Sequence, residues 1–364
     1  NNQLVIVNLK RSFILATIFG LILIVGWELY WRSQNRTPNL DDNKALWAQQ
    51  WSKFETSNEN KIVFIGSSRI LFDIQRPIWK KYTNTDAIML GVQGGTPLPI
   101  LKQVLEDTNY KGLIVVGVAP DLFFWASEID DFSWKRSKAL LDYSKDRTYA
   151  QRINQNLSIP LQKNLAFYRD GNEEWSDDVD LATLLKNLRS GERAGPIPPP
   201  FFNFEDVHLD RNVEMSTKAT QDSVFANTII KAWGLDEWEK EIEDSEEYKK
   251  MQKDIENKRN KVISYFSKYA EEYTRKGGSI VLVRCPSSGK YRDLERRDFP
   301  REEFWDSLVN NTNLPSIHFE DYPQLMGLKI PELSHLSKED ANFFTLELIK
   351  IFKQEGILSN NTLQ

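Results

Sequence analysis

The sequence predicts an α/β protein in which one parallel sheet lies between two layers of helices. Short apolar runs at 62–65, 87–90 and 113–118 alternate with stretches of helical pattern, and similar runs return at 279–284 and 316–319. The third run is rich in β-branched residues, which is typical of a parallel strand covered on both faces. Strands that alternate with helices in this way indicate a doubly wound, three-layer α/β/α fold.

The segments between these runs have the residues expected of helices. One helix is expected from Ile70 to Tyr82 and another from about Pro97 to Asp107, where prolines suit the first turn. A C-terminal helix is expected from Lys338 to Gln354, with Ser337 as its N-cap. Residues 32–60 link the N-terminus to the domain. Aromatic residues spaced four and three apart predict a short amphipathic helix in this linker: Trp47, Trp51 and Phe54.

Residues 13–31 are expected to form a transmembrane anchor behind a short tail, residues 1–12. The apolar run from Phe13 to Tyr30 is close to the ~20 residues that cross a bilayer as a helix. Aromatic residues gather at its far end, as they do where a span meets the membrane surface. A cleaved signal peptide is the alternative, but its apolar core is shorter than this run, and no small-x-small cleavage site follows.

The charges that flank this span are nearly balanced, with Lys10 and Arg11 before it and Arg32 and Arg36 after it. The positive-inside rule therefore specifies the orientation only weakly. A short tail and a large body favour the tail inside and the body outside. We expect a single-pass protein of the inner (cytoplasmic) membrane with its C-terminal domain in the periplasm or extracytoplasmic space.

The α/β pattern covers residues 61–121 and 277–357, and a large, mostly helical insertion, residues 122–276, interrupts it. The insertion is aromatic at its start, polar and helical in its middle, and rich in proline at 195–202. Its last part, 233–276, carries apolar residues at helical spacing among many charges, which predicts a long amphipathic helix packed on the sheet. The insertion as a whole is expected to form a lid over the strand ends or a cap that binds a partner.

The composition argues against several classes of function. A net charge of −5 gives no support for nucleic-acid binding. Three histidines and one cysteine, without CxxC or HExxH spacing, make a metal centre unexpected, and no cofactor is expected. The single cysteine, Cys285, allows no internal disulfide. We expect it to be a small buried hydrophobe rather than an alternative nucleophile.

Two polar motifs mark the expected active site. Gly-Ser-Ser-Arg at 66–69 directly follows the first expected strand, and Glu-Leu-Ser-His-Leu at 332–336 comes late in the chain. A serine becomes a nucleophile when an imidazole takes its proton and a carboxylate orients that imidazole. Open α/β sheets bind ligands at the carboxyl ends of their strands. We therefore expect the hydroxyl of Ser68 and the ring of His335 within hydrogen-bond reach, or one water apart, at that edge.

The first motif resembles the first block of the SGNH/GDSL hydrolase superfamily, whose fold is flavodoxin-like. The third position of that block is the nucleophile, which implies Ser68. The superfamily's last block is Asp-x-x-His, commonly followed by Leu, and residues 332–336 match it except that Glu332 replaces the aspartate. The resemblance implies that His335 is the general base and that Glu332 orients it. Because glutamate is one methylene longer, another acid such as Asp321 is the alternative orienting residue.

The same resemblance implies an oxyanion hole. Its donors are the backbone N–H of Ser68, a glycine of the second block and an asparagine side chain of the third. Gly94 is the expected second-block donor, and Gly95 is an equal rival. The third block has Asp121 instead of asparagine, so a side-chain donor is missing. Arg69, directly after the nucleophile, either supplies positive charge in its place or forms a solvent-facing ion pair.

One membrane span followed by an SGNH-like domain is also similar to the D-alanyl transfer proteins of teichoic-acid modification and to the alginate O-acetylation proteins. This implies a membrane-anchored serine O-acyltransferase or esterase that acts on a cell-surface polysaccharide and an acyl donor. Arg284, at the same sheet edge as Ser68, is expected to line the acyl or sugar pocket. The implied partners are the lipid bilayer and a membrane-bound O-acyltransferase or another integral membrane protein. The alternative is a catalytically inactive SGNH-like scaffold of a membrane complex, or a glycan-binding protein, because two family residues are replaced.

Overall fold

The computed structural model describes residues 9–56, 61–126, 131–168, 203–240 and 246–359. Within these residues, five parallel strands form one sheet in the order β2-β1-β3-β6-β7. This is the strand order 2-1-3-4-5 of a flavodoxin-like doubly wound sheet. The predicted α/β class and parallel sheet are therefore confirmed. The strands are β1 (Ile62–Ile65), β2 (Ala87–Met89), β3 (Leu113–Gly117), β6 (Ser279–Arg284) and β7 (Ser316–His318).

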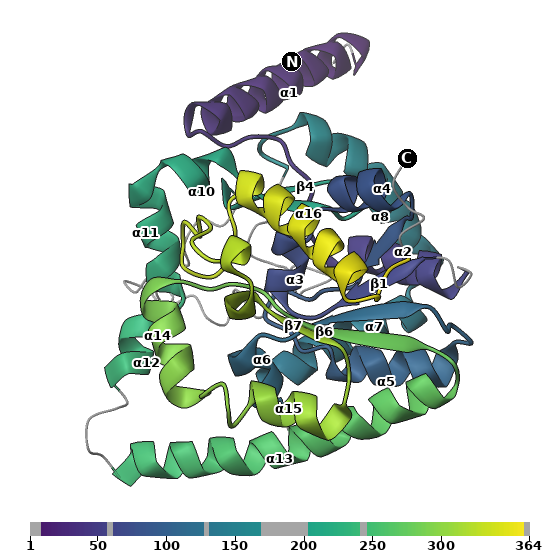
Figure 1. Cartoon of the computed structure of the whole chain (residues 1–364). Coiled ribbons are helices and arrows are strands. Elements are labelled where there is room, and N and C mark those ends of the chain that lie inside the picture. Colours follow the sequence, from purple (N-terminus) through teal and green to yellow (C-terminus); the bar gives the residue numbers. More distant parts are fainter. Residues whose placement is uncertain (1–8, 57–60, 127–130, 169–202, 241–245, 360–364) are drawn as a thin grey trace, which may run out of the picture.

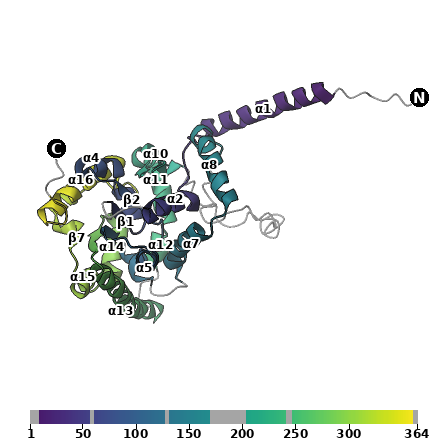
Figure 2. The same ribbon diagram turned by 90° about the vertical axis from the view of Figure 1, so that its right-hand side faces the viewer.

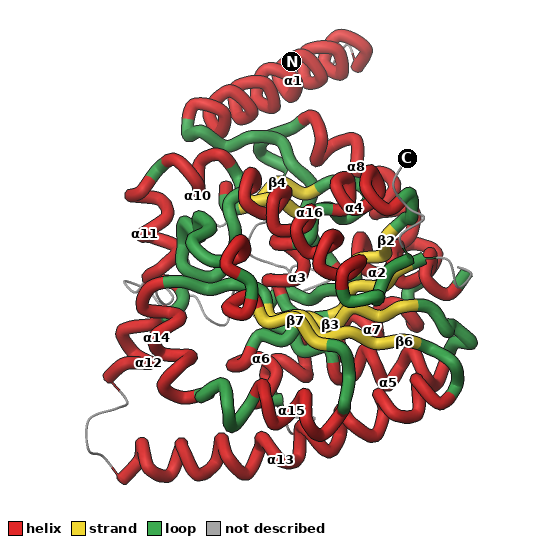
Figure 3. The backbone as a smooth tube through the Cα atoms, in the orientation of Figure 1, coloured by secondary structure: helices red, strands yellow, loops and turns green. Residues whose placement is uncertain are grey.

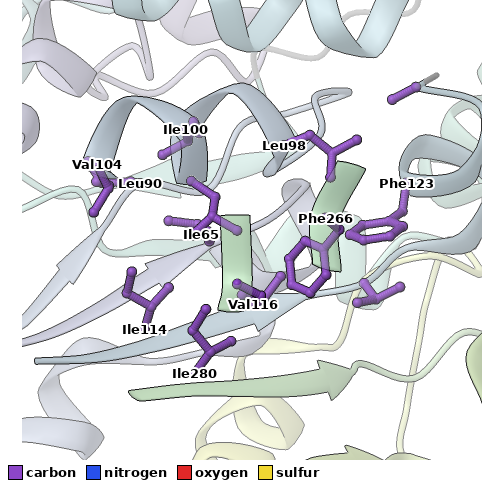
Figure 4. Close-up of a cluster of buried hydrophobic side chains, with 14 of the residues drawn as sticks. Ile65, Leu90, Leu98, Ile100, Val104, Ile114, Val116, Phe123, Phe266 and Ile280 are labelled. Atoms are coloured by element: carbon purple, nitrogen blue, oxygen red, sulfur yellow. The ribbon is translucent and has the colours of Figure 1, made fainter. Parts of the chain in front are cut away.

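Each strand alternates its apolar side chains between the two faces of the sheet, so each face has its own core. On one face Ile65 and Val116 pack beneath α5 (Leu98–Asp107), and Phe266 of α13 (Glu246–Arg275) lies beside them (Figure 4). Figure 3 shows α5 and α13 running along this side of the sheet. The predicted amphipathic segment therefore packs on the sheet.

The C-terminal helix and the helices after β1 cover the opposite face. Phe64 of β1 points to this side and meets Trp79 edge to face, with 4.9 Å between ring centroids. The C-terminal helix has the predicted bounds, and Ser337 caps it by accepting from the N–H of Asp340 at 3.2 Å. The helices of the α/β pattern, besides α5, are α3 (Ser68–Asp73), α4 (Arg76–Thr83), α14 (Gly289–Asp298), α15 (Trp305–Thr312), α16 (Lys338–Gln354) and two short 3₁₀ turns, Phe319–Asp321 and Pro323–Leu325.

The expected single helix at 70–82 is wrong, because the chain divides there into α3 and α4. Pro77 explains the division. Proline has no N–H, so Pro77 cannot donate to the carbonyl of Asp73 four residues earlier, as a continuous helix requires. The hydroxyl of Thr345 on α16 accepts from the N–H of Gln75 at 2.8 Å, and its one proton is shared between that carbonyl at 3.1 Å and the carbonyl of Ala341 at 2.8 Å. The bend between the two helices is thus held by α16.

Residues 122–276 supply parts of both layers. The helix α13 buries Val262, Phe266 and Tyr273 against the sheet. An antiparallel hairpin, which the sequence did not indicate, joins the core of the other face. The proline-rich segment 195–202 lies outside the described residues. The remaining elements of this region are α6 (Pro120–Phe124), α7 (Phe132–Asp146), α8 (Tyr149–Asn164), β4 (Glu205–Val207), β5 (Val213–Met215), α10 (Thr217–Gln221), α11 (Ser223–Ala232) and α12 (Leu235–Lys240).

The N-terminal part consists of one exposed apolar helix and one buried helix. Among the described residues, α1 (Leu9–Ser33) is the one helix long and apolar enough to cross a membrane. Figures 1 and 2 show it standing apart from the body. The next helix, α2 (Lys44–Glu55), buries Trp47, Trp51 and Phe54, as its aromatic spacing predicted.

Candidate active site

The serine motif forms a tight turn between β1 and α3. Gly66 has a φ of 152°, and a Cβ at this position would lie 2.9 Å from the carbonyl oxygen of Gly117 on β3. Only glycine allows the two strands to approach so closely here. Ser67 caps α3 by accepting from the N–H of Arg69 at 3.4 Å, and Ser68 is the first residue of the helix. The turn places Ser68 at the carboxyl edge of the sheet, beside the point between β1 and β3 where ligands bind in this strand order.

His335 reaches the same edge from the loop between β7 and α16. Its Nε2 lies 2.7 Å from Ser68 Oγ, so the predicted contact is present. Its Nδ1 lies 2.9 Å from Glu332 Oε1, which also accepts from the backbone N–H of His335 at 2.6 Å. With the ring proton on Nδ1, the imidazole donates to the carboxylate and accepts from the hydroxyl. His335 and Glu332 are buried, and Ser68 is half-buried.

The second oxygen of Glu332 is held as well. The indole N–H of Trp233, directly after α11, donates to Glu332 Oε2 at 2.7 Å and also lies 3.0 Å from the Glu332 carbonyl. Both carboxylate oxygens are therefore engaged, and the longer side chain of glutamate does reach the imidazole. Asp321, the alternative orienting acid, is exposed and pairs with Arg301 at 2.7 Å. Glu332 is the acid that contacts His335.

Three aromatic rings surround the imidazole of His335. Phe72 of α3 lies 4.6 Å away between ring centroids, and Phe204 and Trp233 each lie at 5.8 Å. Apolar surroundings strengthen the hydrogen bonds of the imidazole because the local dielectric constant is low. Phe204 and Trp233 belong to residues 122–276, so this segment forms part of the site.

Asp73 ties the histidine loop to the helix that begins at Ser68. Its Oδ1 accepts from the N–H of Leu336, the residue after His335, at 3.0 Å. Burial raises the pKa of the Asp73 carboxyl, and it also raises the pKa of the neighbouring Cys285 thiol. A raised pKa disfavours the thiolate that a cysteine nucleophile needs. Cys285 therefore packs as a buried neutral group.

The second-block glycines lie in the loop after β2, beside the serine turn. The N–H of Val92 donates to the carbonyl of Gly66 at 2.8 Å, which joins the two loops. The N–H of Gly95 donates to the carbonyl of Val92 at 2.9 Å, so that donor is already used. Among the described residues, the N–H of Gly94 makes no hydrogen bond. Of the two rivals, Gly94 is the one whose donor is available.

Arg69 is buried in a cluster of charged side chains. Its Nη1 lies 2.6 Å from Glu295 Oε1, and Arg284 binds the other oxygen of Glu295 at 2.6 Å. Although burial opposes its ionisation, Arg284 and Arg69 lower the pKa of the Glu295 carboxyl to about 2. The expected solvent-facing ion pair of Arg69 is therefore wrong, because the pair is buried. Arg284 holds this cluster together, and in the described part of the chain its hydrogen bonds go to Cys285, Ser287 and Glu295 rather than to Ser68 or His335.

Asp121, at the position where the resemblance implies an asparagine, belongs to the same cluster. Its Oδ2 accepts from the hydroxyl of Tyr291 at 2.8 Å, and the guanidinium of Arg69 lies 4.8 Å from the centre of the Tyr291 ring. Its Oδ1 is buried and has no hydrogen-bond partner among the described residues. Burial raises the pKa of the Asp121 carboxyl, which favours the neutral acid that can donate a hydrogen bond.

Sequence reasoning did not find Trp233, Glu295 or Tyr291. Trp233 lies 99 residues from Glu332 in the chain, and its surroundings carry only a helical pattern. Glu295 and Tyr291 lie in a stretch so rich in charge that no single acid stands out. Only the packing of α11 and α14 against the sheet edge reveals what these residues contact.

Among the described residues, no group of three or more His, Cys, Asp or Glu side chains is arranged to hold a metal ion. Comparison with models of known protein families and with curated proteins finds no match for this chain. A functional assignment therefore rests on the geometry of the site itself.

Proposed function

We propose that this chain is a membrane-anchored serine O-acyltransferase or esterase of the SGNH type that acts on a cell-surface polysaccharide. The observation that carries the proposal is the hydrogen-bonded series Ser68–His335–Glu332, with distances of 2.7 Å and 2.9 Å, at the carboxyl edge of the sheet. These residues come from opposite ends of the chain, and a serine, an imidazole and a carboxylate in this order are what acyl transfer requires.

The first half of the reaction forms an acyl-enzyme. Ser68 Oγ attacks the carbonyl carbon of an acyl ester while its proton passes to His335 Nε2. The tetrahedral intermediate then collapses, the bond to the leaving oxygen breaks, and the imidazole returns the proton to that oxygen. Glu332 orients the ring and stabilises its charged form throughout, with Trp233 fixing the carboxylate from the other side.

The second half releases the acyl group. A sugar hydroxyl or a water molecule gives its proton to His335 Nε2 and attacks the acyl carbon. The bond between that carbon and Ser68 Oγ then breaks, and the imidazole returns the proton to Oγ, which restores Ser68. A sugar acceptor makes the protein a transferase, and water makes it an esterase. Half-burial of Ser68 leaves access for either nucleophile.

The oxyanion of each intermediate would be held by the backbone N–H groups of Ser68 and Gly94. The asparagine of the third block is absent, and the loss of one such donor typically costs about 10²–10³ in rate. Slow turnover is therefore expected, which suits an enzyme that modifies a polymer once per site. Asp121 in its neutral form would carry its proton on Oδ1, which has no partner among the described residues, and could donate from there while Oδ2 still accepts from Tyr291.

The helix α1 is the basis for the proposed location. It is apolar enough to anchor the chain, and the catalytic body would then face the extracytoplasmic side with the polysaccharide. Transfer of an activated acyl group to that side implies a partner in the membrane, for which a membrane-bound O-acyltransferase is our candidate.

An ester hydrolysis assay tests the proposal on the purified full chain. With p-nitrophenyl acetate, we expect a burst of nitrophenol close to one equivalent of enzyme, followed by slow turnover, because the acyl-enzyme accumulates. Added oligosaccharide should raise the rate of the slow phase if the enzyme is a transferase. Ser68→Ala should abolish the burst. A folded wild-type protein with no burst and no turnover would contradict the proposal and favour the catalytically inactive scaffold.

A further inference from the structure

The helix α8 buries three polar residues against the body and exposes most of its large apolar ones. Gln155, Ser158 and Gln162 are buried, and Gln162 Oε1 accepts from the backbone N–H of Asp41 at 3.1 Å. A helix on the surface of a water-soluble domain has the opposite arrangement, with apolar residues inward. One apolar residue of α8, Ile159, is partly buried against the core, but the buried face does not explain the exposed apolar residues.

The exposed apolar residues of α8 form one continuous stripe. They recur every four residues, so they follow one another along the same side of the helix, and between 41% and 79% of each is exposed. A row of large apolar side chains in contact with water is costly and marks a surface that binds something apolar. The members of this stripe are Tyr149, Ile153, Leu157 and Leu161.

The C-terminal end of the stripe lies close to the part of α1 that would meet the membrane surface. Glu28 of α1 accepts from the backbone N–H groups of Ala166 and Phe167, just after α8, at 3.0 and 3.2 Å. Arg32 of α1 donates to the carbonyl of Asn164 at 3.1 Å. These contacts fix the end of α8 to the C-terminal end of α1, and Figure 2 shows α8 continuing from that end toward the body.

Aromatic residues indicate that the part of α1 around Glu28 lies at the boundary between lipid and water. Trp27, Tyr30 and Trp31 contact one another within one turn of Glu28, with ring centroids 5.4–5.6 Å apart. Such aromatic belts lie at the boundary between lipid and water. Because Glu28 contacts the segment after α8, this segment lies at the same boundary.

The charges around the stripe fit a membrane surface. From residue 147 to residue 168 the chain has no acidic residue, and its charged residues are Arg147, Arg152 and Lys163. Cations beside an apolar stripe are typical of helices that lie in the surface of a bilayer containing anionic lipids.

We propose that α8 is a second membrane contact, an interfacial helix whose apolar stripe enters the lipid beside α1. Helices of this kind bury their apolar face about 5–10 Å into the boundary of headgroups and acyl chains. The inference requires that α1 spans the bilayer, and it is independent of the reaction proposed for Ser68. Two contacts at one level hold the body in a fixed orientation on the membrane, whereas a single span leaves it free to rotate.

An environment-sensitive fluorophore at the stripe tests this proposal. The full-length Leu157→Cys variant is labelled with nitrobenzoxadiazole and reconstituted into phosphatidylcholine–phosphatidylglycerol vesicles. Phe343→Cys is the matched control, because Phe343 is also an exposed apolar residue but lies on α16, at the opposite end of the molecule from α1 (Figure 2). Native Cys285 is buried, and labelling of the unmodified chain measures its background. Resistance to carbonate extraction shows that each variant is inserted.

We expect the probe at position 157 to emit at shorter wavelength in vesicles and to be quenched by lipids that carry a spin label near the headgroup. The probe at position 343 should emit as in water and remain unquenched. Water-like, unquenched emission from position 157 in inserted protein would overturn the proposal. Emission at shorter wavelength without quenching by spin-labelled lipid would also overturn it, because the stripe would then be covered by protein, either another part of this chain, a second copy or a membrane partner.

Discussion

At the scale of single residues, the site depends on how Glu332 is held. Its two oxygens are used by different partners, with His335 on one and the indole of Trp233 on the other. A carboxylate fixed in this way keeps the imidazole proton on Nδ1 and leaves Nε2 free to take the proton of Ser68. The extra methylene of glutamate is accommodated because the loop that carries it also bonds its backbone to the same carboxylate.

Replacing Glu332 by glutamine should therefore be severe, although the two side chains have the same shape. The amide has only one oxygen, so it cannot accept hydrogen bonds from both His335 and Trp233. The imidazole would then no longer be held with its proton on Nδ1. We expect kcat to fall by about 10⁴, the loss typical of such a change in a serine triad, together with a loss of stability of about 1–3 kcal/mol, because one buried donor that Glu332 accepts would have no acceptor. Glu332→Asp, which keeps the charge but shortens the reach, should retain more activity than Glu332→Gln. Equal activity of the wild type and Glu332→Gln would show that Glu332 has no orienting role.

Trp233 is predicted to act as a positioning residue. Trp233→Phe removes the hydrogen bond to Glu332 while keeping an aromatic ring beside His335. A hydrogen bond to a charged group contributes about 1.5–3 kcal/mol, so kcat should fall roughly 10- to 100-fold, since about 1.4 kcal/mol corresponds to a factor of ten, with little change in KM. Trp238→Phe is the matched control, because it removes an indole hydrogen bond to Asp298 instead. A loss of the same size in both variants would indicate general destabilisation rather than positioning.

At the scale of elements, the bend between α3 and α4 links the nucleophile to the C-terminal helix. Thr345 of α16 accepts from the N–H of Gln75 and donates in part to the carbonyl of Asp73. Asp73 in turn holds the loop of His335 through Leu336. The two halves of the site are therefore joined through buried hydrogen bonds as well as through the Ser68–His335 contact.

Thr345→Val should destabilise the protein, because valine fills the same space but leaves the buried N–H of Gln75 without an acceptor. Such an unsatisfied group costs about 1–3 kcal/mol. Thr345→Ser keeps the hydroxyl and is the control. Denaturant unfolding in detergent measures both, and equal stability of the valine and serine variants would exclude the proposed role of the hydroxyl.

The sequence predicted the strands and most helices because each depends on a local pattern. The run at 279–284 and the helix at 338–354 have the predicted bounds, since their apolar periodicity and capping residue lie within the segment itself. The helix at 70–82 was predicted as one piece although Pro77 within it is a local signal for a break, and only the packing of Thr345 from the distant C-terminal helix shows how the bend is held. The hairpin β4–β5 was missed for a related reason, because its strands are three residues each and depend on packing for stability.

The three catalytic residues could be predicted from two motifs and their order in the chain. The other contacts of the site could not. Ser68, His335 and Glu332 follow from the motifs and from the rule that strand ends meet at one edge. The choice between Glu332 and Asp321 needed distances. The contact of Trp233 with Glu332 and the burial of Arg69 result from tertiary packing. No periodicity in the sequence indicates either of them.

At the scale of the whole molecule, buried ionisable groups should make stability depend on pH. Burial lowers the pKa of His318 to about 2, and the nearby Arg284 and Arg301 act in the same direction. The unfolded chain takes up this proton near pH 6.5, whereas the folded protein does not. Through His318 the unfolded state therefore binds more protons below pH 6.5, and the contribution of this group to the free energy of unfolding falls as the pH is lowered. Glu295, with its pKa lowered to about 2, adds to the same trend below about pH 4.5.

His318→Asn should reduce this dependence between pH 7 and pH 5, a range in which Glu295 does not titrate. One group contributes at most about 1.4 kcal/mol per pH unit, so the slope of unfolding free energy against pH should fall by roughly that amount. His208→Gln is the control. A hydrogen bond with Glu214 raises the pKa of His208, so the stabilisation from His208 is lost as the pH rises, which is the opposite of the effect of His318. An unchanged slope in His318→Asn would show that His318 is protonated in the folded protein.

The central claim is that Ser68 is a nucleophile activated by His335, and a fluorophosphonate probe tests it most directly. Such probes react covalently with activated serine hydroxyls and not with ordinary ones. We predict one equivalent of label on the wild type, located on Ser68 by peptide mass spectrometry, with no label on Ser68→Ala or His335→Ala. Ser67→Ala, which alters the neighbouring hydroxyl, should still be labelled. Undiminished labelling of Ser68→Ala, or no labelling of a folded wild-type protein, would contradict the account.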